Sequence, residues 1–207
     1  MNMTKTEVIE DIAYARSIAE QGARTPLLGS SISLMWGLMV IPTLILHGLT
    51  LMGKFPLSPQ NIGVRWGVYG AIATFGSIYL GRKIDKQPGA KSQINQVGEV
   101  LGIGMGILMA AFAITTVFMV VSKGLPGFLY NMIIVFAFSL ITLNLAVLAR
   151  LTGHTYMKIV ALCSGAITVI TYMLVQSPNI YFFAAFGVII TQIIPSLIGL
   201  KKETANV

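Results

Sequence analysis

The chain has 207 residues, of which 55% are hydrophobic and only 10% are charged, whereas an ordinary soluble domain has about 25% charged residues. So few charges cannot cover a water-exposed surface, which excludes a soluble globular protein and indicates that lipid is the solvent. Lys and Arg number 14 against 7 Asp and Glu, for a net charge of +7, and because the basic residues stand at the ends of apolar segments they suit membrane lipids and not nucleic acid.

Residues 1–25 are polar and are expected to form a short amphipathic cytoplasmic helix. Thr4-Lys5-Thr6-Glu7 fits a capping box, in which Thr4 caps the helix and Glu7 reaches back to it. This helix either lies on the membrane or the inner loops, or docks a cytoplasmic partner.

Six segments are apolar over about 20 residues, the length that crosses the hydrocarbon core. They run from Leu27 to Met52, Gly63 to Gly81, Val100 to Val121, Phe128 to Ala149, Met157 to Val175, and Ile180 to Leu200. The predicted fold class is therefore an all-α integral membrane protein: a six-transmembrane-helix bundle over residues 26–200, followed by a cytoplasmic tail at 201–207. The second segment is the least apolar of the six.

Basic residues between the segments predict the orientation. One set of flanks holds most of them, including Arg82, Lys83, Lys86 and Lys91 in the longest loop, whereas the opposite set holds only Lys54, Arg65 and Lys123. The positive-inside rule assigns the first set, and both termini, to the cytoplasmic side of an inner membrane. The four loop residues carry this orientation signal or, alternatively, also contact anionic lipid head groups.

Small residues recur along two segments at the spacing that lets membrane helices approach closely. The second segment carries such a seam throughout, and the third carries a shorter one: Gly63, Gly67, Gly70, Thr74, Ser77 and Gly81, then Gly98, Gly102 and Gly106. The seam serves either packing inside one bundle or contact with another subunit.

Catalytic and metal-binding groups are absent from the middle of every predicted span. His47 and His154 fall on opposite sides of the membrane, and the ionisable residues nearest the spans, Glu99 and Arg65, fall at their edges. Two histidines so placed cannot share a metal or haem. We therefore expect no enzyme activity, no cofactor and no metal, and we interpret His47 as an interfacial polar residue.

Polar uncharged side chains within the spans have two interpretations. They hydrogen-bond between helices, or three of them, Thr142, Asn144 and Gln192, line a site for a neutral solute.

Two functional hypotheses follow. The first is a non-catalytic accessory, scaffolding or signalling subunit that packs with itself or with a membrane-protein partner through the small-residue seams. The second is a transporter or channel subunit for a neutral or apolar solute. In size and predicted topology the chain resembles the substrate-binding subunits of energy-coupling-factor vitamin transporters. Its first span carries Gly29, Ser33 and Gly37 where that family has an Ala-x-x-x-Ala docking motif.

Overall fold

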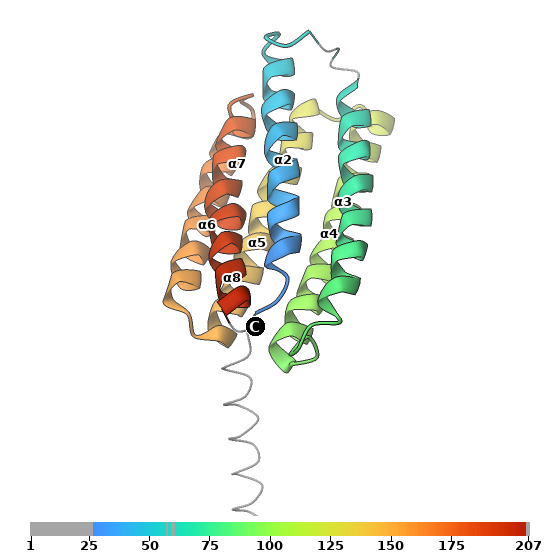
Figure 1. The fold of residues 1–207 in the computed structure, drawn as a ribbon. Helices are drawn as coiled ribbons and strands as arrows, with labels where there is room; N and C mark the ends of the chain where they lie inside the picture. The colour runs from blue at the N-terminus through green and yellow to red at the C-terminus, as the bar shows by residue number, and fades with distance from the viewer. Residues whose placement is uncertain (1–26, 57, 59–60, 206–207) are drawn as a thin grey trace, which may run out of the picture.

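The computed structural model describes residues 27–56, 58 and 61–205, and all the regular structure in these residues is helical. The predicted helix over 1–25 lies outside the described residues. The helices of the described residues form six rods, which stand side by side (Figure 1). Three rods are single helices at the start of the described chain: α2 Ser30–Leu51, α3 Ile62–Ile84 and α4 Gln93–Lys123. The fourth rod is the 3-10 turn η2 Gly127–Asn131 followed by α5 Met132–Thr152, and the fifth is α6 Thr155–Met173. The last rod consists of α7 Ile180–Val188, the π-helical turn η3 Ile189–Ile193 and α8 Ile194–Ala205.

Glycines with positive φ end two of the long helices. Gly124 follows α4 with φ of 64°, and Gly153 follows α5 with φ of 69°. Only glycine adopts this left-handed conformation without a steric penalty, so both helices end where the sequence supplies one.

Five of the rods are long and apolar enough to span a membrane: Ser30–Leu51, Gln93–Lys123, Gly127–Thr152, Thr155–Met173 and Ile180–Lys201. This confirms a multi-pass helical membrane protein. The second predicted span is α3, a helix of 23 residues and so about 35 Å long. It is not among the five, because Arg65 and its many glycines make it less apolar.

The last rod changes its hydrogen bonding halfway along and stays helical. Pro195 has no N–H to donate and its ring crowds the carbonyl of Thr191, four residues earlier. The chain widens into the π-helical turn η3 immediately before this proline. A single π-turn of this kind absorbs the misfit without breaking the rod.

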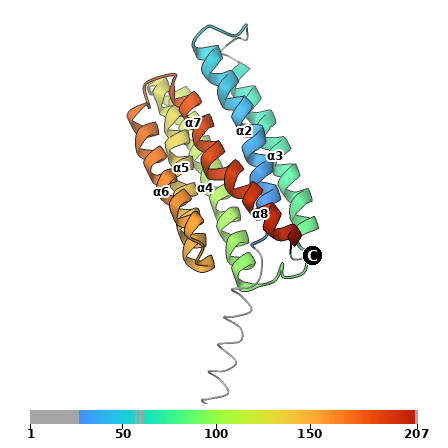
Figure 2. The same ribbon diagram turned by 60° about the vertical axis from the view of Figure 1, so that its left-hand side comes forward.

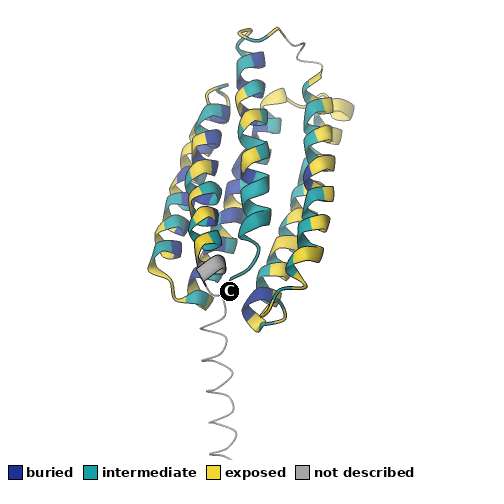
Figure 3. Ribbon diagram, in the orientation of Figure 1, coloured by how far each residue is buried: buried dark blue, intermediate teal, exposed yellow. Residues whose placement is uncertain are grey.

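The core lies where α5, α6 and α7 meet α2. Its most deeply buried members include Leu44 of α2, Phe138 of α5 and Ile180 and Ala184 of α7. α3 packs on α2, and α4 packs on α5. Colouring by burial shows few buried residues on α3 and α4 (Figure 3), so the bundle has one well-packed side and one open side.

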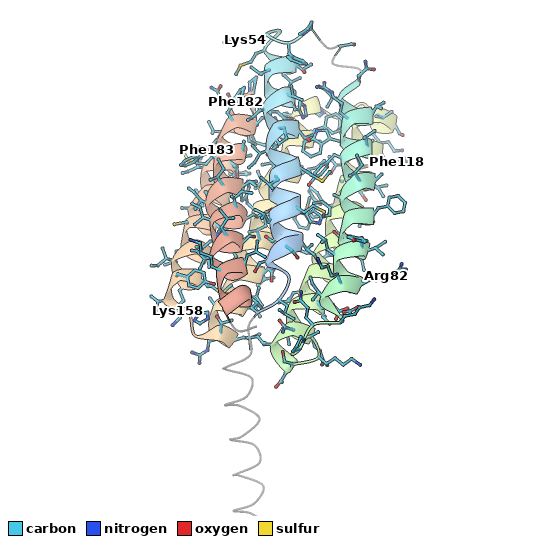
Figure 4. All side chains as sticks on the ribbon, in the orientation of Figure 1. Lys54, Arg82, Phe118, Lys158, Phe182 and Phe183 are labelled. Carbon is cyan, nitrogen blue, oxygen red and sulfur yellow. The ribbon has the colours of Figure 1, made fainter. Side chains whose placement is uncertain are left out.

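The two ends of the bundle differ in how many basic residues they carry. Lys54 lies at one end, and Arg82 and Lys158 lie at the other (Figure 4). The view turned by 60° also shows the α3–α4 connection and the end of α8 at this second end (Figure 2). We call the two the Lys54 end and the basic end. Arg82 and Lys158, which the positive-inside rule assigns to one side of the membrane, thus lie at one end of the bundle, and Lys54, which it assigns to the other side, lies at the opposite end.

Candidate functional site

A chain of polar and aromatic contacts crosses the bundle near the Lys54 end. The indole Nε1 of Trp66 in α3 donates a hydrogen bond of 3.0 Å to Nδ1 of His47 in α2. The His47 ring lies 3.9 Å, centroid to centroid, from the ring of Tyr181 in α7. The Tyr181 hydroxyl donates to Oδ1 of Asn131, whose amide nitrogen donates to the carbonyl oxygen of Val175 at 2.7 Å. Four helices are thereby tied together at one level.

Arg65 lies beside this chain, in the first turn of α3. Its two terminal guanidinium nitrogens donate to Oγ1 of Thr50 at 3.2 and 3.3 Å. The Thr50 hydroxyl in turn donates to the carbonyl of Leu46. The third guanidinium nitrogen, Nε, is buried and has no hydrogen-bond partner among the described residues. Arg65 as a whole is half-buried, and a charged side chain near a membrane interior is a functional candidate.

A groove of about 500 Å³ separates α2 from α3 beside Arg65. Four aromatic and charged side chains line it: His47, Arg65, Trp66 and Tyr69. The rest of its lining is largely aliphatic, contributed by both helices: Leu38, Met39, Pro42, Thr43, Leu46, Ile62, Val64, Val68 and Ile72. Sites for drug-sized ligands have volumes of about 300–1,000 Å³ and a similar mixture of apolar walls and a few polar groups.

Five helix glycines are filled, by which we mean that a side chain of a neighbouring helix occupies the space that a Cβ would take. A Cβ added at Gly187 would lie 2.8 Å from Phe138, and one at Gly48 would lie 2.9 Å from Phe182. Gly37 similarly faces Ile193, Gly76 faces Met35, and Gly199 faces Ser30. Gly187 allows α7 to pack closely on α5 and α6, and the other four glycines allow α2 to pack closely on α3, α7, η3 and α8.

Most of the predicted seam is not filled. An added Cβ meets no atom within 4 Å at Gly63, Gly67, Gly70, Gly81, Gly102 and Gly106. Gly98 has only distant neighbours, Leu27 and Leu148 at 3.8 and 3.9 Å. Both hydroxyl members donate within their own helix, Thr74 to the carbonyl of Gly70 and Ser77 to that of Ala73, and Ser77 also accepts from the Trp36 indole of α2. We call the six unfilled glycines of the predicted seam the open glycine rows: Gly63, Gly67, Gly70 and Gly81 on α3, and Gly102 and Gly106 on α4.

The three predicted solute-site residues lie at three different interfaces. Thr142 is 2.8 Å from the Ser164 hydroxyl of α6. Asn144 points its amide nitrogen at the sulfur of Met105 in α4, 3.8 Å away, and its Oδ1 is buried without a partner. Gln192 lies in η3 beside Gly37 of α2. No described contact joins the three, and the solute site stays a prediction.

The predicted lipid-contact residues gather at the basic end. Arg82 and Lys83 end α3, Lys86 and Lys91 follow in the connection to α4, and all four are exposed. Their contact with anionic lipid stays a prediction. Among the described residues, no three His, Cys, Asp or Glu side chains lie close enough to share a metal ion.

Sequence reasoning placed His47 and Arg65 separately at the outer ends of two spans and did not connect them. The sequence did contain a signal that these two residues are close together. The first two spans are consecutive and antiparallel, so their ends meet across one short loop. Trp66, adjacent to Arg65, is the residue that completes the contact to His47.

These features define the class as a multi-pass, all-α membrane protein with one open side and a polar groove near one end. No protein-family model, curated protein or solved structure matches the chain.

Proposed function

We propose that the protein is a non-catalytic subunit of a cytoplasmic-membrane assembly, and that the open glycine rows of α3 and α4 are its contact surface. In this proposal α3 is the sixth span, and the basic end faces the cytoplasm because Lys and Arg concentrate in cytoplasmic loops. The observation that carries the proposal is the division of the helix glycines into filled and unfilled sets.

The filled glycines show what this sequence does with a small residue inside its own bundle. Phe138 and Ile167 close over Gly187, and Ile193 closes over Gly37. In lipid there is no hydrophobic force between helices, so association depends on such close packing. The open rows offer the same packing opportunity with none of the described helices in place, which supports docking of a helix from another subunit or a second copy.

Exposure of α3 and α4 supports the same surface. The spanning window of α4 contains no buried residue, whereas a third of the α5 window is buried (33%). On α3 only Ala73 is buried. A helix held on one side alone gains stability when another subunit covers its other side.

The proposal predicts that one glycine of α4 is needed for association and that its neighbour two positions along is not. Gly102 belongs to an open row, whereas Gly104 points about 200° away around the helix, and an added Cβ is free at both. We expect Gly102→Leu to reduce the associated fraction about tenfold, equivalent to about 1.4 kcal/mol. Gly104→Leu should leave it unchanged. Native mass spectrometry of nanodisc-purified protein measures the fraction and identifies the bound subunit.

A wild-type protein that emerges alone, or equal losses in the two variants, contradicts this assignment. A stoichiometric second copy identifies a homo-oligomer, and a different stoichiometric protein identifies an accessory subunit.

A carrier for a neutral solute is the second candidate, and the orphaned Oδ1 of Asn144 favours it. Asn144→Leu removes a buried polar atom that has no partner, so we expect the free energy of unfolding to stay equal or to rise by up to about 1 kcal/mol. A carrier loses solute uptake in the same variant. Thermal unfolding in detergent and uptake into proteoliposomes measure the two effects. A marked loss of stability would show that the side chain is structural instead.

A further inference from the structure

We infer that the groove between α2 and α3 binds an anionic amphiphile, with its carboxylate or phosphate head at Arg65 and its hydrocarbon tail along the apolar part of the groove. This site is separate from the open glycine rows. It rests on the shape of the groove, on the uncompensated charge of Arg65 and on the exposure of α3.

The groove is itself amphipathic along its length. It runs from His47 to Leu38 on α2 and from Ile62 to Ile72 on α3, about ten residues or 15 Å on each helix. Because the two helices are antiparallel, His47 and Arg65 share the Lys54 end of the groove, whereas Leu38 and Ile72 lie toward the middle of the bundle. A polar head and an extended tail would occupy these two parts.

Arg65 has no counter-ion in the described chain. The nearest acidic residue along its own helix is Asp85, the C-cap of α3, twenty positions and about 30 Å away. Glu99 stands near the start of α4, at the same far end. Within the part of the chain that the structure describes, Arg65 hydrogen-bonds to the neutral Thr50 hydroxyl, and its buried Nε has no partner. An anionic oxygen against the guanidinium side that lines the groove would supply the missing charge.

The position of Arg65 on α3 strengthens the need for an anion. It lies in the first turn, where the helix dipole is already positive and no acidic residue stands. No side chain caps this end of the helix, so backbone N–H groups add to the donors. A cation placed here is unfavourable by itself, and a bound anion compensates both the guanidinium charge and the positive end of the helix dipole.

The remaining polar groups of the groove are donors or are already satisfied. Nδ1 of His47 accepts from Trp66, so the neutral imidazole carries its hydrogen on Nε2 and has a donor left. The Thr43 hydroxyl donates to the carbonyl of Met39 in its own helix. No carboxylate lines the groove. This balance of groups favours an anionic head over a cationic one.

The groove is accessible from the side of the bundle. Val64, Val68 and Ile72 line it and are more than half exposed, at 66%, 53% and 54%. α3 packs mainly against α2 among the described elements, so a hydrocarbon tail can enter laterally from the acyl chains around the bundle.

Trp66 provides a direct test, because it lines the groove and the chain has only two tryptophans. In a Trp36→Phe background, dibromostearate bound in the groove should quench Trp66 fluorescence saturably. The dibromostearate methyl ester has the same chain and no charge, and should quench only by non-saturable partitioning. A lysophosphatidate with the same brominated chain tests the phosphate head, and saturation by either anion supports the site and identifies the head group.

Arg65→Gln is expected to weaken saturable quenching at least tenfold. Arg82→Gln removes the same charge from the opposite end of α3 and should leave it unchanged. Equal quenching by acid and ester, or an unchanged affinity in Arg65→Gln, overturns the inference. If Arg65→Gln does not fold, competition in the Trp36→Phe protein decides: unbrominated oleate must displace the bound anion and methyl oleate must not.

Discussion

Replacement of Gly187 by leucine is expected to disrupt the α5–α6–α7 core and lower the free energy of unfolding by at least about 3 kcal/mol. The first added carbon alone would lie 2.8 Å from Cζ of Phe138 and 2.9 Å from Cγ2 of Ile167, and both neighbours are buried. Overpacking a close-packed core usually costs about 1–3 kcal/mol, and leucine adds three further carbons where even the first does not fit. The midpoint of thermal unfolding in detergent, together with the yield of monodisperse protein, measures the effect.

Gly67→Leu is the matched control, because it makes the same substitution in a helix where an added Cβ meets nothing. Alanine is favoured over glycine inside helices by about 1 kcal/mol, so Gly67→Ala should be neutral or stabilising. Gly187→Ala should still destabilise, because its Cβ is already too close to Phe138. Similar unfolding midpoints for Gly67→Leu and Gly187→Leu would contradict the packing described for α7.

The helical segments could be predicted from the sequence because a membrane imposes one length and one composition. The predicted span Leu27 to Met52 corresponds to α2 Ser30–Leu51, and Ile180 to Leu200 corresponds to α7 through α8. The largest boundary difference is at α4, which was expected to begin at Val100 and begins at Gln93. Apolar length marks only the part of a helix that is in hydrocarbon, whereas backbone hydrogen bonding continues through a polar turn at the surface.

Glycine spacing predicted a surface but could not say what lies against it. Gly37 and Gly67 both belong to regular small-residue rows, yet the Ile193 side chain occupies the space beside Gly37 and no described residue occupies the space beside Gly67. Gly187, which is enclosed by both Phe138 and Ile167, belongs to no row that the sequence indicated. Whether a glycine is filled depends on the large residue opposite, and therefore on the register between helices that are distant in the sequence.

The groove depends on register in the same way. His47 and Arg65 were each visible as polar residues near a span end, but a shared site requires α2 and α3 to align Trp66 with His47. The hydrogen bond between those two side chains spans 19 positions of sequence. No periodicity within one helix encodes it.

The second large effect is expected at Asn131, in the polar chain near the Lys54 end. Asn131 joins the Tyr181 hydroxyl to the carbonyl of Val175, and both Asn131 and Tyr181 are buried. Asn131→Leu leaves the hydroxyl without its acceptor and the carbonyl without its donor. Each of these two orphaned groups costs about 1–3 kcal/mol, so a loss of about 2–6 kcal/mol in the free energy of unfolding is expected in thermal unfolding.

A double-mutant cycle separates the hydrogen bond from simple packing. Tyr181→Phe removes the hydroxyl that Asn131→Leu would orphan, so the double variant should lose about 1 kcal/mol less than the sum of the two single losses. Thr74→Val, which removes an exposed hydroxyl bonded within its own helix, should change stability little. Strictly additive losses at Asn131 and Tyr181 would mean that the two side chains act independently. Coupling would instead show that this bond ties η2 to α7. The bond would then stabilise the same end of the bundle in which His47 and Trp66 line the groove.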